Sequence, residues 1–324
     1  MKTFVLLVVL MAVQTLFETL SNAEQSRQVP RIGIVVSGSA SNPEQYRNRA
    51  VFLNALKELG YIAGQNIILE YRYAEGKSEL LPELLRELIG LKVSILIPSG
   101  PTAIGPSVKA TQTIPILMHD SGNPIRRGFI ETFARPGRNV TGVSTYVPGL
   151  YAKQLELLKE TIPSAVRIAV IIPTRNSSIS EYRDAARSLQ MEIQPHDYFD
   201  SEGLKAVLLR LAGTRPDALA VVRHTSTIQY AQHITNLALK NRLPSMFDSQ
   251  QFVQAGGLMS YGVNRSAVWR RIAVYVDKLL KGANPATLPV EPAKLEMAIN
   301  LQTARRIGIT IPPKIMFEAN NVIK

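Results

Sequence analysis

The sequence predicts an α/β protein made of two similar lobes, each built on a doubly wound parallel sheet. Short apolar runs alternate with longer helical segments, which is the pattern of successive βαβ units. This order of elements occurs twice, first from Arg31 and again from Arg167, although the spacing drifts, so the order is shared without a strict repeat. A chain of 324 residues is long enough for two lobes of about 120–150 residues, each with its own core.

The first series starts at residues 31–36, a continuous apolar run typical of a strand buried on both faces of a parallel sheet. The other predicted strands of this series are short and rich in apolar or β-branched residues: 66–73, 93–97, 115–119 and 140–145. The predicted helices between them are 44–59, 78–89 and one that begins near Thr102. A turn at 146–149 ends the series.

The second series repeats this order. Its predicted strands are 167–172, 191–198, 218–222, 244–247 and 258–261, and its predicted helices are 177–189, 202–211, 228–241 and 266–280. A late strand at 294–300 and a helix at 301–307 follow a Pro-rich connector. We therefore expect a first lobe of residues 31–146 plus about 262–290, which cross back, and a second lobe of residues 147–261 plus about 291–324.

The N-terminus has the layout of a secretory signal peptide. Lys2 precedes the apolar run 4–13, and the small residues of Ser21-Asn22-Ala23 suit cleavage before Glu24. We expect a signal peptide over 1–23 and a leader over 24–30; an uncleaved anchor is the alternative. Either reading predicts a periplasmic or other extracytoplasmic protein. The chain has no cysteine, which excludes a lipid-modified Cys, disulfides, thiolate metal sites and a cysteine nucleophile.

The formal net charge is +12. The Lys and Arg residues are scattered along the sequence. The sequence lacks the basic stripe interleaved with aromatic residues that proteins use to bind single-stranded nucleic acid. We interpret the surplus as solvated surface and expect no nucleic-acid partner.

Polar side chains follow the strands of both series. In open α/β sheets, ligands bind outside the carboxyl ends of the strands, against such loops and helix N-termini. Taken singly, each residue is better explained as a helix cap or a loop residue; taken together, they predict a binding site for a small molecule. The candidates are Ser37, Ser39, Ser99, Thr102, Asp120, Asn123, Thr145, Asn176, His224, Asp248 and Tyr261.

Catalytic signatures are weak. His119 and Asp120, with Ser99 and Ser121, could form a Ser–His–Asp set on paper, but no Gly-x-Ser-x-Gly elbow exists. The four histidines show no metal-ligand spacing, and the glycine-rich nucleotide motifs are absent. We expect a binding protein with no catalytic residue, cofactor or metal.

Five motifs carry a family resemblance. LGYIAGQNI at 59–67 and EYRYAEG at 70–76 are followed by RPGRNVTGV at 135–143, GGLMSYG at 256–262 and INLQTA at 299–304. Together the chain from Arg31 to Lys324 resembles the ABC transporter substrate-binding proteins of the tryptophan/tyrosine-binding-like family. The motifs are specific for the family and weak for the ligand.

The resemblance implies a fold like that of type I periplasmic binding proteins, with two lobes joined by a multi-strand hinge of three crossovers. It implies a monomer that closes on a solute and presents it to a membrane permease driven by a separate ATPase. By comparison with family members that bind aromatic amino acids, the resemblance implies polar ligand contacts at matching positions of this chain: Ser37, Ser39, Ser99, Thr102, Thr145, Asn176 and Asp248.

One departure bears on the ligand. The family usually has an Asp-Pro pair after the fourth strand, where this chain has Asn123-Pro124. An Asn cannot pair with a ligand ammonium as a carboxylate does, so either Asp120 replaces it or the ligand lacks that group. His224 also occupies a position where smaller or acidic residues are common. The ligand is thus expected to be an amino acid or a similar small carboxylate.

Two other functions remain open at this point. The chain could sense a ligand for a membrane kinase or chemoreceptor, because two-lobed binders transmit ligand state by hinge closure. It could also be an exported hydrolase that uses His119 or His224.

Overall fold

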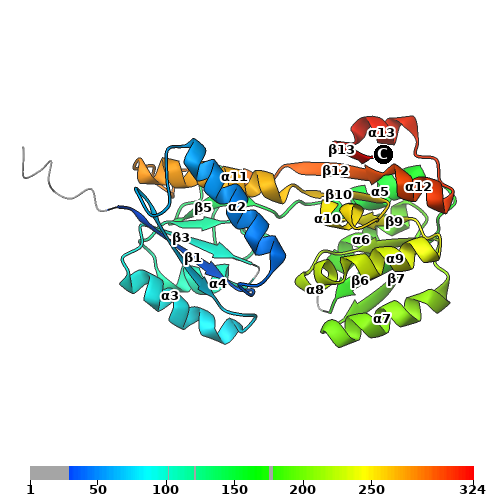
Figure 1. The fold of residues 1–324 in the computed structure, drawn as a ribbon, viewed down its shortest axis with the longest axis horizontal. Coiled ribbons are helices and arrows are strands. Elements are labelled where there is room, and N and C mark those ends of the chain that lie inside the picture. Colours follow the sequence, from blue (N-terminus) through cyan, green and yellow to red (C-terminus); the bar gives the residue numbers. More distant parts are fainter. Residues whose placement is uncertain (1–28, 101, 120–121, 175–177) are drawn as a thin grey trace, which may run out of the picture. The chain divides into compact units, whose positions relative to one another are not determined.

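The computed structural model describes residues 29–100, 102–119, 122–174 and 178–324. The expected signal peptide and most of the leader lie outside these residues. The described chain forms two compact units (Figure 1). Unit 1 ends at Val143 and also takes Trp269–Glu291; unit 2 takes Ser144–Val268 and Pro292–Lys324. The chain therefore passes between the units three times, within β5, α11 and β11.

Unit 1 contains a sheet in the order β11-β5-β4-β3-β1-β2. Strands β1 to β5 pair in parallel wherever they are neighbours. The strands are β1 (Arg31–Val36), β2 (Ile68–Tyr73), β3 (Ile95–Ser99), β4 (Ile116–Met118), β5 (Val140–Ser144) and β11 (Glu291–Pro292). The order reverses at β1, because β2 lies on one side of it and β3 on the other. Right-handed crossovers then place α2 on one face and α3 and α4 on the opposite face.

The helices of unit 1 begin at residues suited to helix starts. Asn42 accepts a hydrogen bond from the Glu44 N–H at 2.9 Å, and Pro43 occupies the first position of α2. The helices, with one 3₁₀ turn, are α2 (Pro43–Glu58), η1 (Ser78–Leu80), α3 (Leu81–Gly90), α4 (Ile104–Ala110) and α11 (Arg265–Leu280), whose first turn belongs to unit 2.

Unit 2 repeats the strand order of unit 1. Its sheet runs β13-β12-β10-β9-β8-β6-β7, so β10-β9-β8-β6-β7 corresponds to β5-β4-β3-β1-β2. The strands are β6 (Arg167–Pro173), β7 (Glu192–Tyr198), β8 (Ala218–Val221), β9 (Ser245–Phe247), β10 (Met259–Val263), β12 (Leu295–Asn300) and β13 (Asn321–Ile323). Only β12 breaks the parallel pattern, by pairing antiparallel with β10. The predicted fold class, two similar doubly wound lobes, is confirmed.

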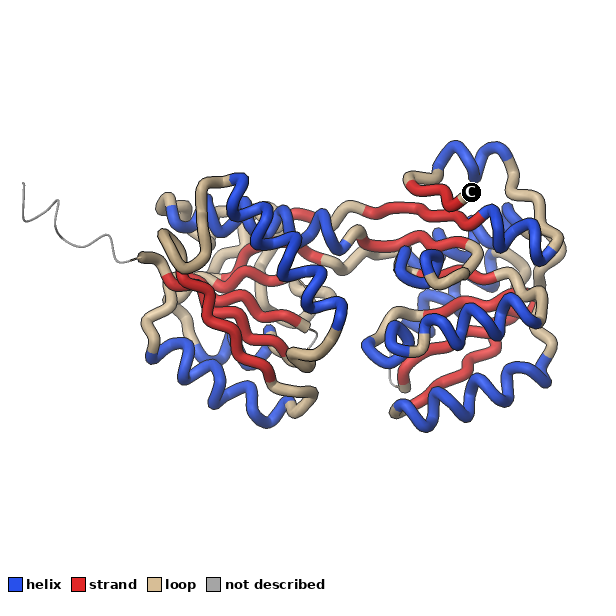
Figure 2. Tube along the Cα trace, viewed as in Figure 1, coloured by secondary structure: helices blue, strands red, loops and turns tan. Residues whose placement is uncertain are grey.

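Helices cover both faces of the unit 2 sheet, and each unit is a layered α/β arrangement (Figure 2). The helices are α5 (Leu150–Thr161), α6 (Ser178–Ser188), α7 (Ser201–Thr214), α8 (Thr225–Gln229), α9 (Ala231–Lys240), α10 (Gln250–Gln254), α12 (Leu301–Ile307) and α13 (Pro313–Glu318). The predicted helix 228–241 is in fact two helices that meet at Tyr230. Helices α5, α10 and α13 had no counterpart among the predicted elements.

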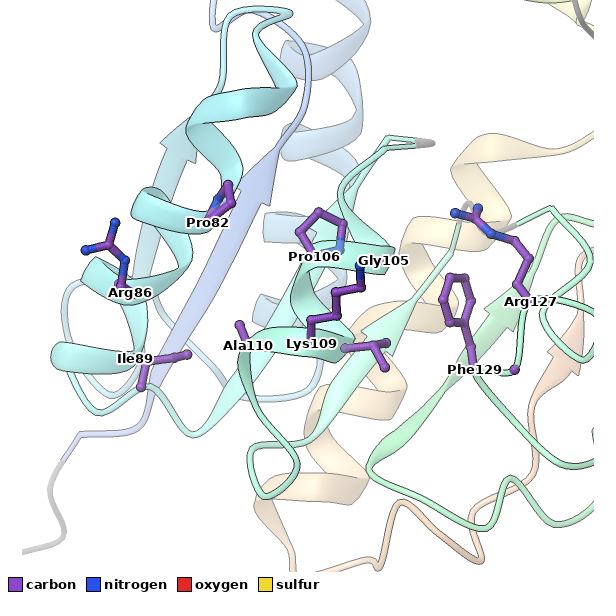
Figure 3. A pocket seen from close by; sticks show the side chains of 11 residues that line it. Pro82, Arg86, Ile89, Gly105, Pro106, Lys109, Ala110, Arg127 and Phe129 are labelled. Atoms are coloured by element: carbon purple, nitrogen blue, oxygen red, sulfur yellow. The ribbon is translucent and has the colours of Figure 1, made fainter.

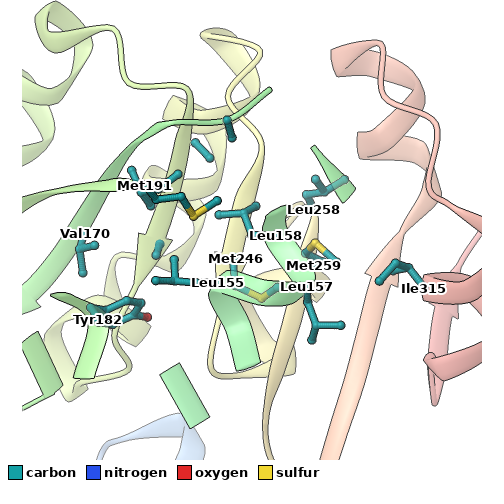
Figure 4. Close-up of a cluster of buried hydrophobic side chains, with 14 of the residues drawn as sticks. Leu155, Leu157, Leu158, Val170, Tyr182, Met191, Met246, Leu258, Met259 and Ile315 are labelled. Atoms are coloured by element: carbon teal, nitrogen blue, oxygen red, sulfur yellow. The ribbon is translucent and has the colours of Figure 1, made fainter. Parts of the chain in front are cut away.

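Strand β6 explains why these strands read as continuous apolar runs. Ile168, Val170 and Ile172 face one hydrophobic cluster, whereas Ala169 and Ile171 face another. Successive side chains of a strand point to opposite faces, so a strand with a core on both sides needs apolar residues at every position. Figure 4 shows the first cluster, which α5 and α6 close.

Candidate functional site

Three loops meet at the carboxyl end of the unit 1 sheet. The Ser37 N–H donates to the Ser99 carbonyl at 2.9 Å, which joins the loop after β1 to the end of β3. The Gly76 N–H donates to the Ser37 carbonyl at 3.0 Å, which adds the loop after β2. Gly100 has a φ of +98°, and a Cβ there would lie 2.0 Å from the Ser37 Oγ. The predicted residues Ser37 and Ser99 are therefore brought together. The close approach of Gly100 to Ser37, at a positive φ, favours glycine at position 100.

Ser39 is also at this edge, but its hydroxyl has local partners. Its Oγ lies 2.9 Å from the Ser41 Oγ, and the Glu75 Oε1 accepts from the Ala40 N–H at 3.0 Å. The Ser39 hydroxyl and then the Ala40 N–H lower the pKa of the Glu75 carboxyl. Glu75 was not among the predicted residues, because only the pairing of β1 with β2 brings it to this loop.

The structure gives Asn123 a local role. Its Oδ1 accepts the Arg126 N–H at 3.0 Å, so the side chain closes the turn that follows β4. The neighbouring His119 is only 3% exposed, and its ring centroid lies 4.6 Å from that of Trp269 in α11. An imidazole packed in this way has little access to a substrate, which argues against His119 as a catalytic base.

Two more predicted residues lie in connecting segments. Thr102 is exposed in the turn before α4, and Thr145 is half-buried directly after β5, in unit 2. Asp120 and Asn176 lie outside the described residues.

Asp248 is the predicted residue with the most distinctive surroundings. It follows β9, at the carboxyl end of the unit 2 sheet, and its Oδ2 accepts the Arg223 N–H at 2.9 Å. Its Oδ1 is buried and has no hydrogen-bond partner among the described residues. Burial raises the pKa of the Asp248 carboxyl to about 6, although the Arg223 N–H and the charges of Arg223 and Arg265 lower it. A buried acceptor without a donor is costly, so a cationic group would be stabilised beside it.

His224 caps the short helix α8. Its Nδ1 lies 2.7 Å from the Ser226 Oγ and accepts from the Ser226 N–H at 3.4 Å, while the His224 N–H donates to the Thr227 Oγ1 at 2.8 Å. Partial desolvation, and then the positive charge of Arg223, lowers the pKa of the imidazole. The neutral ring is the form that accepts a hydrogen bond, so the cap and the pKa agree.

Tyr261 lies within β10 and is half-buried against the cluster of Figure 4. Its carbonyl accepts from the Gln154 Nε2 at 2.7 Å, and the Gln154 Oε1 accepts from the Tyr182 hydroxyl at 2.8 Å. This buried chain of hydrogen bonds links α6, α5 and β10. Its partners are far apart in sequence, and no local signal predicts it.

Two negative findings apply to the described residues alone. No group of three or more His, Cys, Asp or Glu side chains there has the arrangement of a metal site. No helix within those ranges has both the length and the apolar character needed to cross a bilayer.

Two doubly wound units of one strand order, joined by three passages of the chain, define the class of two-unit α/β proteins. A family model described as ABC transporter substrate binding protein matches residues 32–323. The chain belongs to this family, which comprises solute-binding receptors and is not a family of enzymes. The predicted resemblance is thus confirmed.

Three similar proteins are distant in sequence, but the similarity covers most of the chain. The chain is 24% identical over 289 residues to a tyrosine-binding protein of Clostridioides difficile, covering 88% of this chain and 82% of the relative. A conserved domain protein from Vibrio cholerae has a TM-score of 0.80 at 23% identity, covering 91% of this chain and 100% of the other. An ABC domain from Streptococcus pneumonia in complex with L-Trp has a TM-score of 0.79 at 21% identity, covering 91% of this chain and 99% of the other.

Proposed function

We propose that this protein is an extracytoplasmic receptor that binds an amino acid with an aromatic side chain and delivers it to the permease of an ABC importer. In this proposal the carboxyl-end loops of both units contact the ligand, and the units close on it. The receptor acts as a monomer and reaches the exterior through the signal peptide expected at 1–23. Membership of the substrate-binding family supports the role. The tyrosine and L-Trp named for two relatives support the ligand class.

The choice of an amino acid as the ligand rests on the surroundings of the Asp248 carboxylate. One of its oxygens is buried without a hydrogen-bond donor, at the sheet edge where α/β proteins bind ligands. A ligand ammonium would supply the missing donor and a positive charge in addition to those of Arg223 and Arg265. Asp248 therefore takes the ammonium-pairing role for which Asn123 is unsuited, since the Asn123 amide oxygen already accepts from Arg126.

A matched ligand pair tests this assignment. L-Tyrosine and 3-(4-hydroxyphenyl)propionate differ only in the α-ammonium, so calorimetric titration of both isolates its contribution. We expect wild type to bind the amino acid at least about tenfold more tightly, and Asp248→Asn to remove most of that preference. L-Tryptophan and its desamino analogue repeat the comparison with a larger ring.

The outcomes separate the parts of the proposal. Equal affinity for both members of each pair would overturn the role of Asp248 but leave a carboxylate receptor. Absence of binding to all four, in a folded protein stabilised by some other solute, would reject the ligand class. Hydrolysis of esters or peptides that is lost in a His224→Ala variant would reject the receptor role. Co-purification with a membrane kinase in place of a permease would favour the sensory alternative.

A further inference from the structure

Unit 1 carries a groove that lies along α3 and α4 and is bounded on one side by the loop that follows β4 (Figure 3). Its volume is about 830 Å³. Helices α3 and α4 and the loop that contains Arg127 and Phe129 form its walls and floor. The apolar part of the lining consists of Pro82, Ile89, Gly105, Pro106, Val108, Ala110, Gly128 and Phe129.

Every charged side chain that lines this groove is positive. Arg86 comes from α3, Lys109 from α4 and Arg127 from the loop, with the Arg127 guanidinium 4.7 Å from the centre of the Phe129 ring. Arg86 and Lys109 are exposed, and no ion pair joins either of them to another described residue. The acidic Glu87 of α3 is paired instead with Arg72, at 2.7 Å. At Arg86 and Lys109 the groove therefore carries positive charge, beside an apolar floor, that no described residue balances.

The arrangement of these cations distinguishes a macromolecular partner from a small anion. In Figure 3, Arg86 and Arg127 lie on opposite sides of α4, and Lys109 lies between them. Sites for small anions converge several donors on one point, whereas these cations are spread along an open groove. An amphipathic helix fits such a groove, with its apolar face on the floor and carboxylates at its flanks.

We propose that this groove of unit 1 is a docking site for an acidic amphipathic helix of a partner protein. The charge pattern supplies orientation and speeds encounter, while burial of apolar surface on the floor supplies most of the affinity. A second copy of this chain is a poor occupant, because its formal net charge is +12. The proposal is independent of the ligand assigned above.

A synthetic helix of leucine and glutamate, about 16 residues long so that it is helical when bound, is a suitable probe, with a counterpart in which lysine replaces glutamate. Fluorescence anisotropy of the labelled peptides with the full protein gives the affinity. We expect saturable binding of the acidic peptide that weakens as salt rises from about 50 to about 300 mM, and no binding of the basic peptide. The variant Arg86→Glu/Lys109→Glu should bind at least about tenfold more weakly.

Arg47→Glu/Lys57→Glu is the matched control, since it makes the same change of charge on exposed positions of α2, across the sheet. It should alter affinity less than about twofold. Equal loss in both variants, equal binding of both peptides, or no saturable binding would overturn the proposal. So would binding of vesicles with anionic lipid but not of the peptide. Thermal unfolding and solute binding of both variants should match wild type, which separates docking from misfolding and from the ligand site.

Discussion

The two units share a strand order but hold their carboxyl-end loops by different means. In unit 1 the loops after β1, β2 and β3 are joined by backbone hydrogen bonds, such as Ser37 N–H to the Ser99 carbonyl. In unit 2 backbone bonds join Thr174 to Tyr198 and Val222 to Ile171, but side chains also hold the loop after β8. Asp248 accepts the Arg223 N–H of that loop, and His224 caps the helix that follows. The same topology can thus hold one edge mainly through backbone hydrogen bonds and the other partly through the titratable side chains of Asp248 and His224.

The largest expected effect tests what the units share. In each unit the fifth strand, β5 or β10, carries a glycine that packs against the end of the fourth strand, β4 or β9. A Cβ at Gly142, where φ is +128°, would lie 2.4 Å from the Met118 carbonyl oxygen, and one at Gly262 would lie 2.0 Å from that of Asp248. Gly142→Ala and Gly262→Ala should each lower the free energy of unfolding by about 2–5 kcal/mol, measured by urea denaturation.

Gly90→Ala is the control for these variants, because a Cβ at the end of α3 meets no atom within 4 Å. It should change stability by about 1 kcal/mol or less. A tolerated alanine at either strand position would show that the close approach of the two strands is not a shared requirement.

The next effect tests the difference between the units through pH. The pKa of Asp248 is raised from 3.8 to about 6, so the folded protein binds this proton more tightly than the unfolded chain. The group therefore stabilises the fold at acid pH, and this contribution is lost as the pH rises from about 4 through 6. Asp248→Asn should gain stability relative to wild type across that interval, by up to about 3 kcal/mol. Urea denaturation at pH 4, 5, 6 and 7 measures the change.

Ser99→Ala is the unit 1 counterpart, at the carboxyl end of β3. Its stability relative to wild type should not vary over the same pH range, because the substitution removes no titrating group. Parallel pH profiles for wild type and Asp248→Asn would refute the claim that the Asp248 carboxyl makes the unit 2 edge pH-dependent.

The smallest expected effect concerns the His224 cap. His224→Ala should destabilise the protein by about 1 kcal/mol at neutral pH, and His224→Asn by less, because Asn also accepts from a helix N–H. The lowered pKa of His224 means that its contribution is present above about pH 6.5 and is lost as the pH falls through the folded pKa. Thermal unfolding between pH 5 and 8 should show His224→Asn to be less acid-sensitive than wild type; equal sensitivity would mean that the cap survives protonation.

Local patterning was sufficient for much of the architecture. The continuous apolar runs at 31–36 and 167–172 required strands with a core on both faces, and the repeated order of elements required two alike sheets. It was not sufficient at Tyr230, where one predicted helix is two, or at α5, which the prediction lacked. The family motifs, spread over nearly the whole chain, identified the class of protein.

The roles of the polar residues depended on contacts between distant parts of the chain. Residue type alone made Ser37, Asn123 and Asp248 equivalent candidates. Folding assigned Ser37 to a glycine contact, Asn123 to a turn and Asp248 to a half-buried position with one buried, unsatisfied oxygen. A side chain's hydrogen-bonding state is set by which neighbours the fold brings within about 3 Å, and periodicity along the sequence carries no record of those neighbours.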